Sequence, residues 1–114
     1  MTIQRVNRRE QVERDIWQAT AYCRSEGGAR LETAFVEALA EVSELLYGHP
    51  ESGSLRYAAI MDFADLRCWS MRRFPYMIFY TARGTVLDVW RILHVQRDVP
   101  ERFQTPTANP EGSP

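Results

Sequence analysis

The sequence predicts an α+β domain in which an N-terminal antiparallel helix hairpin packs on an antiparallel sheet of three to four strands. Apolar residues recur at helical spacing through the first half of the chain, and β-rich runs with tight connections fill residues 66–100. With 114 residues, of which 45% are hydrophobic and 25% charged, the chain can bury the core of a single domain. We expect this domain to span residues 1–103 and a flexible tail, rich in Pro, Thr, Asn, Gly and Ser, to follow over 104–114.

Two helices are predicted, over about 8–25 and 29–47. Asn7 offers an N-cap for the first helix, whose apolar stripe consists of Val12, Ile16, Ala19 and Cys23. The glycines at 27–28 are expected to end it, because glycine accepts the left-handed conformation of a C-terminal cap. The second helix has a continuous apolar face, and Gly48 followed by a proline predicts its end. A two-residue link predicts an antiparallel hairpin whose apolar face needs a sheet to cover it.

Three successive strands are predicted, from LRCWSM, FPYMIFYTAR and VLDVWRILHVQ, with a further short strand possible over residues 2–6. Along the last run, both sets of alternating side chains are largely apolar, so both faces of the sheet are expected to be covered. Arg91 interrupts the more apolar set. Its guanidinium either pairs with a buried carboxylate or lines a functional surface.

Charge is distributed unevenly along the chain, and all 14 basic residues are arginine. Residues 1–66 hold 7 Arg against 11 acidic residues, residues 67–97 hold 6 against one, and residues 98–114 hold one against three. A basic sheet after an acidic front half indicates an anionic partner, such as nucleic acid, a nucleoprotein enzyme or an acidic peptide. The alternative is that the arginines pair internally with the acidic helices.

Few residues suggest chemistry of their own. His94 could act as an acid or base, but a histidine at a strand end is more often hydrogen-bonded structure. Two cysteines, Cys23 and Cys68, are expected to be reduced and packed, and with two distant histidines they predict neither a metal site nor a cofactor. No apolar run reaches the roughly 18 residues of a membrane span, and no secretory signal is visible, so a cytoplasmic protein without membrane contact is expected.

The segments GSLRYA, LRCWSMRRFPYMIFY and VLDVWRILHVQRDVP together resemble the ParE branch of the RelE/ParE toxins of bacterial type II toxin–antitoxin systems. The resemblance covers about residues 53–103. It implies a ParD-like antitoxin whose flexible C-terminal segment wraps the toxin and whose N-terminal half binds DNA. It also implies that the toxin poisons DNA gyrase by stabilising its cleaved-DNA complex, without catalysis and with DNA met only indirectly.

Two alternatives stay open. RelE-like toxins are ribosome-dependent mRNA endonucleases and carry two arginines and a tyrosine, at positions that match Met77, Arg97 and Phe103 here. Methionine cannot hold a phosphate charge and phenylalanine cannot exchange a proton, which favours the ParE reading over the nuclease. The other alternative is an inert module that only binds antitoxin.

Partner contacts are predicted from charge and aromatic content. We expect contacts with the target from Arg67, Arg72, Arg73, Arg91, His94 and Arg97. Contacts with the antitoxin are expected from Trp17, Phe35, Trp69 and Trp90, on the helix hairpin and an exposed sheet edge. Alanine at positions 91 and 97 is expected to abolish toxicity while leaving the fold intact.

Overall fold

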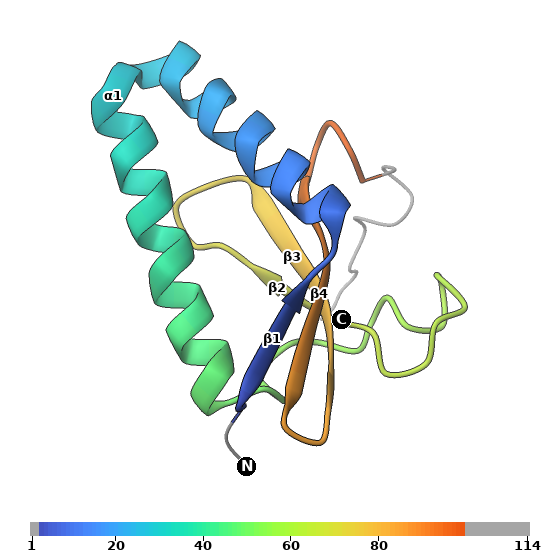
Figure 1. The fold of residues 1–114 in the computed structure, drawn as a ribbon. Coiled ribbons are helices and arrows are strands. Elements are labelled where there is room, and N and C mark those ends of the chain that lie inside the picture. The colour runs from blue at the N-terminus through green and yellow to red at the C-terminus, as the bar shows by residue number, and fades with distance from the viewer. Residues whose placement is uncertain (1–2, 100–114) are drawn as a thin grey trace.

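The computed structural model describes residues 3–99 and places one long, broken helix over one face of a four-stranded sheet (Figure 1). The elements are β1 (Arg5–Arg8), α1 (Glu10–Gly48), β2 (Arg67–Ser70), β3 (Tyr76–Arg83) and β4 (Val86–His94). The predicted α+β class is therefore confirmed. The last residues of the predicted domain, including Phe103, and the predicted flexible tail lie outside the described residues.

The predicted break at the glycine pair is present, but the predicted hairpin is not confirmed. Gly27 and Gly28 lie within α1 with non-helical backbone angles, and Gly28 has φ 71° and ψ −164°, a combination that essentially only glycine adopts. Figure 1 shows two arms that diverge from this break, where the sequence had predicted two antiparallel helices side by side. Each arm buries its own apolar residues, the first Val12, Ala19 and Cys23, the second Phe35 and Leu46.

The predicted start of the helix was wrong, whereas its end was right. Asn7 belongs to β1, and Arg9 occupies the N-cap position without a side-chain capping bond. The first turn instead contains two acidic side chains, Glu10 and Glu13, whose negative charges interact favourably with the positive end of the helix dipole. At the other end α1 stops at Gly48, and the backbone N–H of His49 closes the last turn on the Leu45 carbonyl at 2.8 Å.

The sheet is mixed, so the prediction of a purely antiparallel sheet was wrong. The strand order is β1-β4-β3-β2, with β4–β3 and β3–β2 antiparallel and β1 parallel to β4. β1 and β4 are separated by α1, β2 and β3, and a connection of that length lets the chain return in the same direction. The alternation in residues 2–6 was too brief to reveal this pairing.

A bulge disturbs the predicted alternation of β4. Phe79 pairs with Arg91 and Tyr80 with Val89, which leaves Trp90 as the additional residue. As a result, Leu87, Val89 and Ile92 pack in one core, although strict alternation had placed Ile92 in the other set. β4 also ends at His94, two residues before the predicted end, because the chain turns over residues 95–98.

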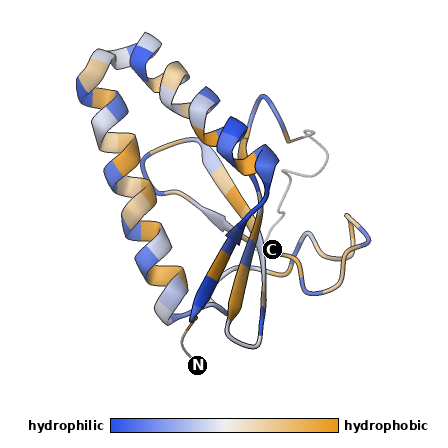
Figure 2. Cartoon of the chain, in the orientation of Figure 1, coloured by the Kyte–Doolittle hydropathy of each residue, from blue (hydrophilic) through white to orange (hydrophobic). Residues whose placement is uncertain are grey.

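Two apolar cores form, one on each face of the sheet. The larger core joins α1 to Tyr76, Ile78 and Tyr80 of β3. The smaller core contains the side chains of the other face of β3, Met77 and Phe79, together with Tyr57, Leu66, Cys68 and Val99. Figure 2 shows the matching pattern of hydrophobic and hydrophilic residues alternating around both arms of α1. The expectation that both faces of the sheet are covered is confirmed.

Both cysteines are free and buried, one in each core, as predicted. Among residues 3–99, no helix is long and apolar enough to cross a membrane. The same residues contain no group of three His, Cys, Asp or Glu side chains placed to hold a metal ion.

Candidate functional site

The six side chains predicted to contact a target do not form one surface. Arg67 turns toward the loop that follows α1, where Nη1 donates to the carbonyls of Glu51 at 3.1 Å and Gly53 at 2.8 Å. It therefore fastens this loop to β2. A guanidinium that already donates to backbone carbonyls has less freedom to bind an incoming anion.

Arg91 takes the first of the two roles that the sequence left open, because it pairs with a buried carboxylate. Its Nε donates to Asp15 Oδ2 at 2.9 Å and its Nη2 to Oδ1 at 3.1 Å, while the backbone N–H of Ile92 also donates to Oδ2 at 2.9 Å. The Asp15 side chain is only 3% exposed. This hydrogen bond raises the pKa of Arg91 above its ordinary value, although burial opposes the rise. The pair ties the first arm of α1 to β4.

His94 is buried and organises the turn after β4. Its Nδ1 accepts from the backbone N–H groups of Gln96 and Arg97, both at 3.2 Å, and the Asp98 carboxylate accepts from the His94 backbone N–H at 2.9 Å. The ring meets Tyr22 and Tyr76 edge-on, with centroid separations of 5.4 and 5.2 Å. Burial lowers the pKa of His94, and the charge of Arg97 lowers it further against the opposing effect of Asp98. These contacts describe a neutral, structural histidine.

Arg97 is half-exposed and lies above this turn. Its guanidinium carbon is 5.2 Å from the centre of the Tyr22 ring, and Nε lies 3.6 Å from the Asp98 carboxylate. Burial raises the pKa of the neighbouring Tyr76 hydroxyl, and Arg97 partly offsets the rise. The Tyr76 oxygen makes no hydrogen bond of regular geometry among the described residues, and Arg97 is the nearby charged group that lowers its pKa.

Arg72 and Arg73 are the two candidates whose charges are uncommitted. Both are exposed in the loop between β2 and β3, and no described residue forms an ion pair with either. They lie along a groove of about 540 Å³ between this loop and the second arm of α1, which we call the β2 groove; its other lining residues are Ala38, Glu41, Val42, Leu45, Trp69 and Met71. The β2 groove thus combines apolar side chains with two arginines and one glutamate, Glu41, beside an edge strand.

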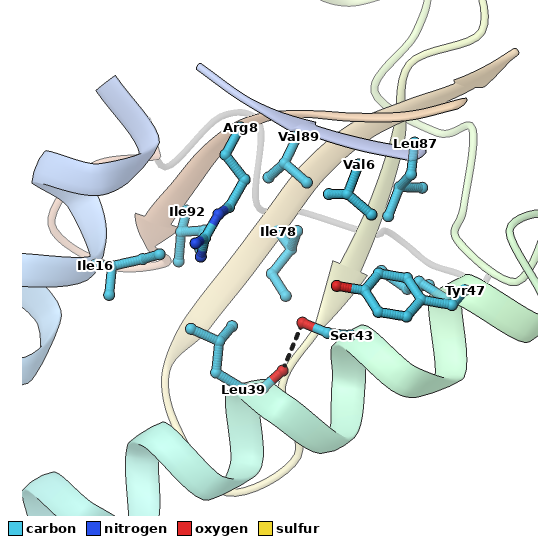
Figure 3. A pocket seen from close by; sticks show the side chains of 11 residues that line it. Val6, Arg8, Ile16, Leu39, Ser43, Tyr47, Ile78, Leu87, Val89 and Ile92 are labelled. Carbon is cyan, nitrogen blue, oxygen red and sulfur yellow. Dashed lines mark hydrogen bonds between the residues drawn. The ribbon is translucent and has the colours of Figure 1, made fainter. Parts of the chain in front are cut away.

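A smaller apolar notch of about 60 Å³ lies where the arms of α1 diverge over the sheet. Figure 3 shows Ile16 of the first arm and Leu39 of the second around the notch, with Ile78 of β3 opposite Ile16 and the Arg8 side chain pointing in from β1. Arg8 is also paired with Glu13 at 3.1 Å at the surface. The notch therefore lies between the two arms of α1 and the sheet.

The comparisons with known proteins agree with this architecture. The model of the ParE toxin family, described as the ParE toxin of the type II toxin–antitoxin system parDE, matches residues 6–99. This chain belongs to the ParE toxin family. It is also similar in fold to a solved structure of the chromosomal ParDE toxin–antitoxin system from P. aeruginosa, with a TM-score of 0.67 and 15% sequence identity, over 82% of this chain and 97% of that chain. A search of the curated proteins found no significant match.

In this ParE toxin, three of the four residues predicted to contact the antitoxin are at least partly exposed, and only Phe35 is fully buried. Trp17 is 72% exposed on the first arm of α1, and Trp69 lines the β2 groove. Phe35 is fully buried and packs edge-on against Phe74 and Tyr76, so it is a core residue.

Trp90 is held on the face of the sheet away from α1. Its Nε1 donates to Thr81 Oγ1 at 3.1 Å, its ring meets Phe63 edge-on, and the guanidinium carbon of Arg9 lies 3.4 Å from the ring centre. These contacts describe a residue that fixes the sheet's second core in place.

Sequence reasoning missed two features of the site. Asp15 is the partner of Arg91, and a signal was available, because Asp15 interrupts the apolar stripe of the first helix between Val12 and Ala19. The β2 groove had no signal, since it joins side chains about 30 residues apart that only the packing of α1 against the edge of the sheet brings together.

Proposed function

We propose that this chain inhibits DNA gyrase by binding it and stabilising its cleaved-DNA complex, and that a ParD-like antitoxin neutralises it. The domain expected over 1–103 would do so in the bacterial cytoplasm, meeting DNA only through gyrase or the antitoxin. The observation that carries the non-catalytic part is the closed face of the sheet. Met77, at the position where RelE-like nucleases carry an arginine, is 2% exposed and packs with Tyr57, Leu66 and Val99.

A closed apolar face does not suit RNA cleavage. A nuclease must bring a phosphate against charged donors and activate a 2′-hydroxyl with a nearby base. Here the corresponding face holds a methionine, and placing a phosphate there without a charged partner would be strongly unfavourable. His94 cannot replace the missing groups, because it is buried on the face toward α1 and its Nδ1 is occupied by two backbone N–H groups.

The β2 groove supports the antitoxin part of the proposal. An extended segment of a partner with acidic and apolar side chains would place its carboxylates near Arg72 and Arg73 and its apolar groups against Trp69 and Val42. Such a segment would also cover the edge strand β2 and protect it from pairing with other chains. Trp17, which is exposed on the first arm, offers a further aromatic anchor.

A gyrase-mediated DNA cleavage assay tests the proposal. Purified protein should increase the amount of linear DNA that gyrase leaves after denaturation, and adding the cognate antitoxin in equimolar amount should abolish the increase. The same preparation should leave ribosome-bound mRNA intact.

Cleavage of mRNA in the ribosomal A site without any effect on gyrase would contradict the proposal and establish a nuclease. If both assays stayed silent while the protein bound antitoxin tightly, the chain would be an inert antitoxin-binding module.

A further inference from the structure

A projecting segment carries most of the exposed apolar side chains. Of the five large hydrophobic residues that are exposed in residues 3–99, three belong to the segment between α1 and β2: Leu55 at 47%, Ile60 at 50% and Met61 at 37%. We call these three residues the apolar tip. Figure 1 shows this part of the chain, in yellow-green, projecting away from α1 and the body of the sheet. Exposed apolar groups gathered on one projection mark an interaction site more often than scattered ones do.

The segment is held in a defined conformation although it contains no helix or strand. Its turns are closed by backbone hydrogen bonds from Ala58 to Leu55 at 2.9 Å, from Met61 to Tyr57 at 2.9 Å and from Phe63 to Ala58 at 2.8 Å. A surface fixed before binding loses less conformational entropy when it meets a partner.

Aromatic anchors fasten both sides of the apolar tip to the sheet. Tyr57 is 1% exposed and meets Phe79 edge-on, with ring centres 5.5 Å apart, and Phe63 meets Trp90 at 4.5 Å. Tyr57 is therefore buried and Phe63 is partly buried, while Ile60 and Met61 between them are exposed. Packing in the core therefore does not explain why Ile60 and Met61 lie where they do.

We propose that the apolar tip is the surface through which this chain binds its protein target. The proposal rests on the proposed function, since it assigns a contact surface to the same toxic activity. The partner it fits is a protein with an apolar pocket for Ile60 and Met61 and a basic group beside the pocket, because Asp62 is exposed next to the tip and no described residue forms an ion pair with it, whereas Asp65 lies 4.0 Å from Arg83.

Charge argues for a protein and against a nucleic acid at this surface. Residues 55–66 contain two aspartates and one basic residue, Arg56, whose guanidinium carbon lies 5.0 Å from the centre of the Tyr57 ring. One arginine beside two aspartates offers a phosphate backbone little attraction, and binding to nucleic acid depends mainly on basic contacts to phosphate. Asp62 and Asp65 also adopt the left-handed region, with φ 52° and 70°, a conformation that carries some cost outside glycine and is often kept at binding sites.

The apolar tip is separate from the surfaces assigned to the antitoxin. The anchors Tyr57 and Phe63 pack in the core on the face of the sheet away from α1, whereas the β2 groove is lined by α1. Two of the five predicted arginine contacts, by contrast, are committed elsewhere, Arg67 to loop carbonyls and Arg91 to Asp15. Substitutions in the apolar tip should therefore affect binding of the target and leave binding of the antitoxin unchanged.

The test compares an Ile60→Ser/Met61→Ser double variant with Val36→Ser, which removes a side chain that is 50% exposed on the second arm of α1. For each protein, thermal unfolding, antitoxin affinity, gyrase-mediated DNA cleavage and growth arrest on expression are measured. The double variant should unfold at the wild-type temperature and bind antitoxin normally. Its concentration for half-maximal DNA cleavage should rise at least about tenfold, as expected when central anchors of an interface are lost. Val36→Ser should behave as wild type on gyrase.

Two results would overturn the assignment. One is a folded double variant that poisons gyrase and arrests growth as well as wild type does; the other is a double variant that loses antitoxin binding but stays toxic. A wild-type chain that arrests growth without any effect on gyrase would instead remove gyrase as the target. Growth arrest by the double variant would then still decide the role of the apolar tip, and Leu55→Ser would provide an independent second variant.

Discussion

At the scale of single residues, the Arg91–Asp15 pair means that a substitution of Arg91 affects the stability of the fold as well as any contact with a partner. The Asp15 carboxylate is 3% exposed, whereas the Arg91 side chain is 43% exposed. The pair therefore serves mainly to satisfy a carboxylate that the first arm of α1 buries. The expectation that alanine at position 91 leaves the fold intact does not agree with this geometry.

We predict that Arg91→Ala lowers the free energy of unfolding by about 2 kcal/mol, because Asp15 would keep its burial and lose two charge-assisted hydrogen bonds. Urea denaturation measures the change. Arg83→Ala is the matched control, since Arg83 is 66% exposed and lies 4.0 Å from Asp65, and it should change stability by less than about 0.5 kcal/mol. Equal unfolding midpoints for the two variants would contradict the structural role of Arg91.

The lowered pKa of His94 predicts how the free energy of unfolding depends on pH. Its pKa is lowered in the folded protein from an ordinary 6.5, so the unfolded chain takes up a proton first as the pH falls. Its contribution to stability is therefore complete well above pH 6.5 and is lost as the pH falls below that value toward the folded pKa. The groups that face the ring are Tyr22 of α1, Tyr76 of β3, and Arg97 and Asp98 of the following turn.

Unfolding free energies measured between about pH 7.5 and 5 should fall for the wild type and fall less steeply for His94→Gln. The window stays above the range in which most carboxylates titrate. If the two proteins showed parallel pH profiles, His94 would not be the group responsible.

At the scale of elements, the break and the end of the helix could be predicted from the sequence, whereas the pairing of β1 could not. The break at Gly27 and Gly28 and the end of α1 at Gly48 follow from the backbone freedom of glycine, which acts locally. The parallel pairing of β1 with β4, the bulge at Trp90 and the divergence of the arms depend on contacts between distant segments, which local patterns do not encode.

Replacing either of two tyrosines of β3 with phenylalanine is expected to have opposite effects on the free energy of unfolding. The Tyr80 hydroxyl accepts from the Gly53 backbone N–H at 2.9 Å and donates to the Pro50 carbonyl at 2.8 Å, whereas the buried Tyr76 hydroxyl makes no hydrogen bond of regular geometry among the described residues. Tyr80→Phe would leave two buried backbone groups unpaired, so it should lower the free energy of unfolding by about 1–3 kcal/mol. Tyr76→Phe should be neutral or stabilising. Denaturant unfolding of both variants gives the comparison, and a greater loss in Tyr76→Phe would contradict the assigned contacts.

The β2 groove predicts a charge-dependent antitoxin interface. Reversing both charges, in Arg72→Glu/Arg73→Glu, should weaken antitoxin binding at least about tenfold and reduce its dependence on salt. Isothermal titration at two salt concentrations measures both effects, and Arg83→Glu serves as a control at an exposed arginine outside the groove. An unchanged Kd in the double variant would place the antitoxin elsewhere.

At the scale of the whole molecule, the fold class and the family resemblance were predictable, while the site was predictable only in part. Charge counting identified the basic second half of the chain, but it could not tell the free charges of Arg72 and Arg73 from the committed ones of Arg67 and Arg91. Likewise, Phe35 looked like any other aromatic residue on a helix face until packing placed it in the core. Whether a charged or aromatic side chain already has partners within the fold depends on its surroundings in three dimensions.

The central claim is that the chain acts by occupying a partner and breaks no bond itself, as the closed face around Met77 suggests. The most direct test is to titrate purified protein against a fixed amount of gyrase and DNA and to follow the amount of cleaved DNA to completion. Binding predicts a plateau that depends on the ratio of chain to gyrase, with no nucleic acid cut when gyrase is omitted. Substoichiometric amounts that eventually cleave all of an RNA or DNA substrate would contradict the claim.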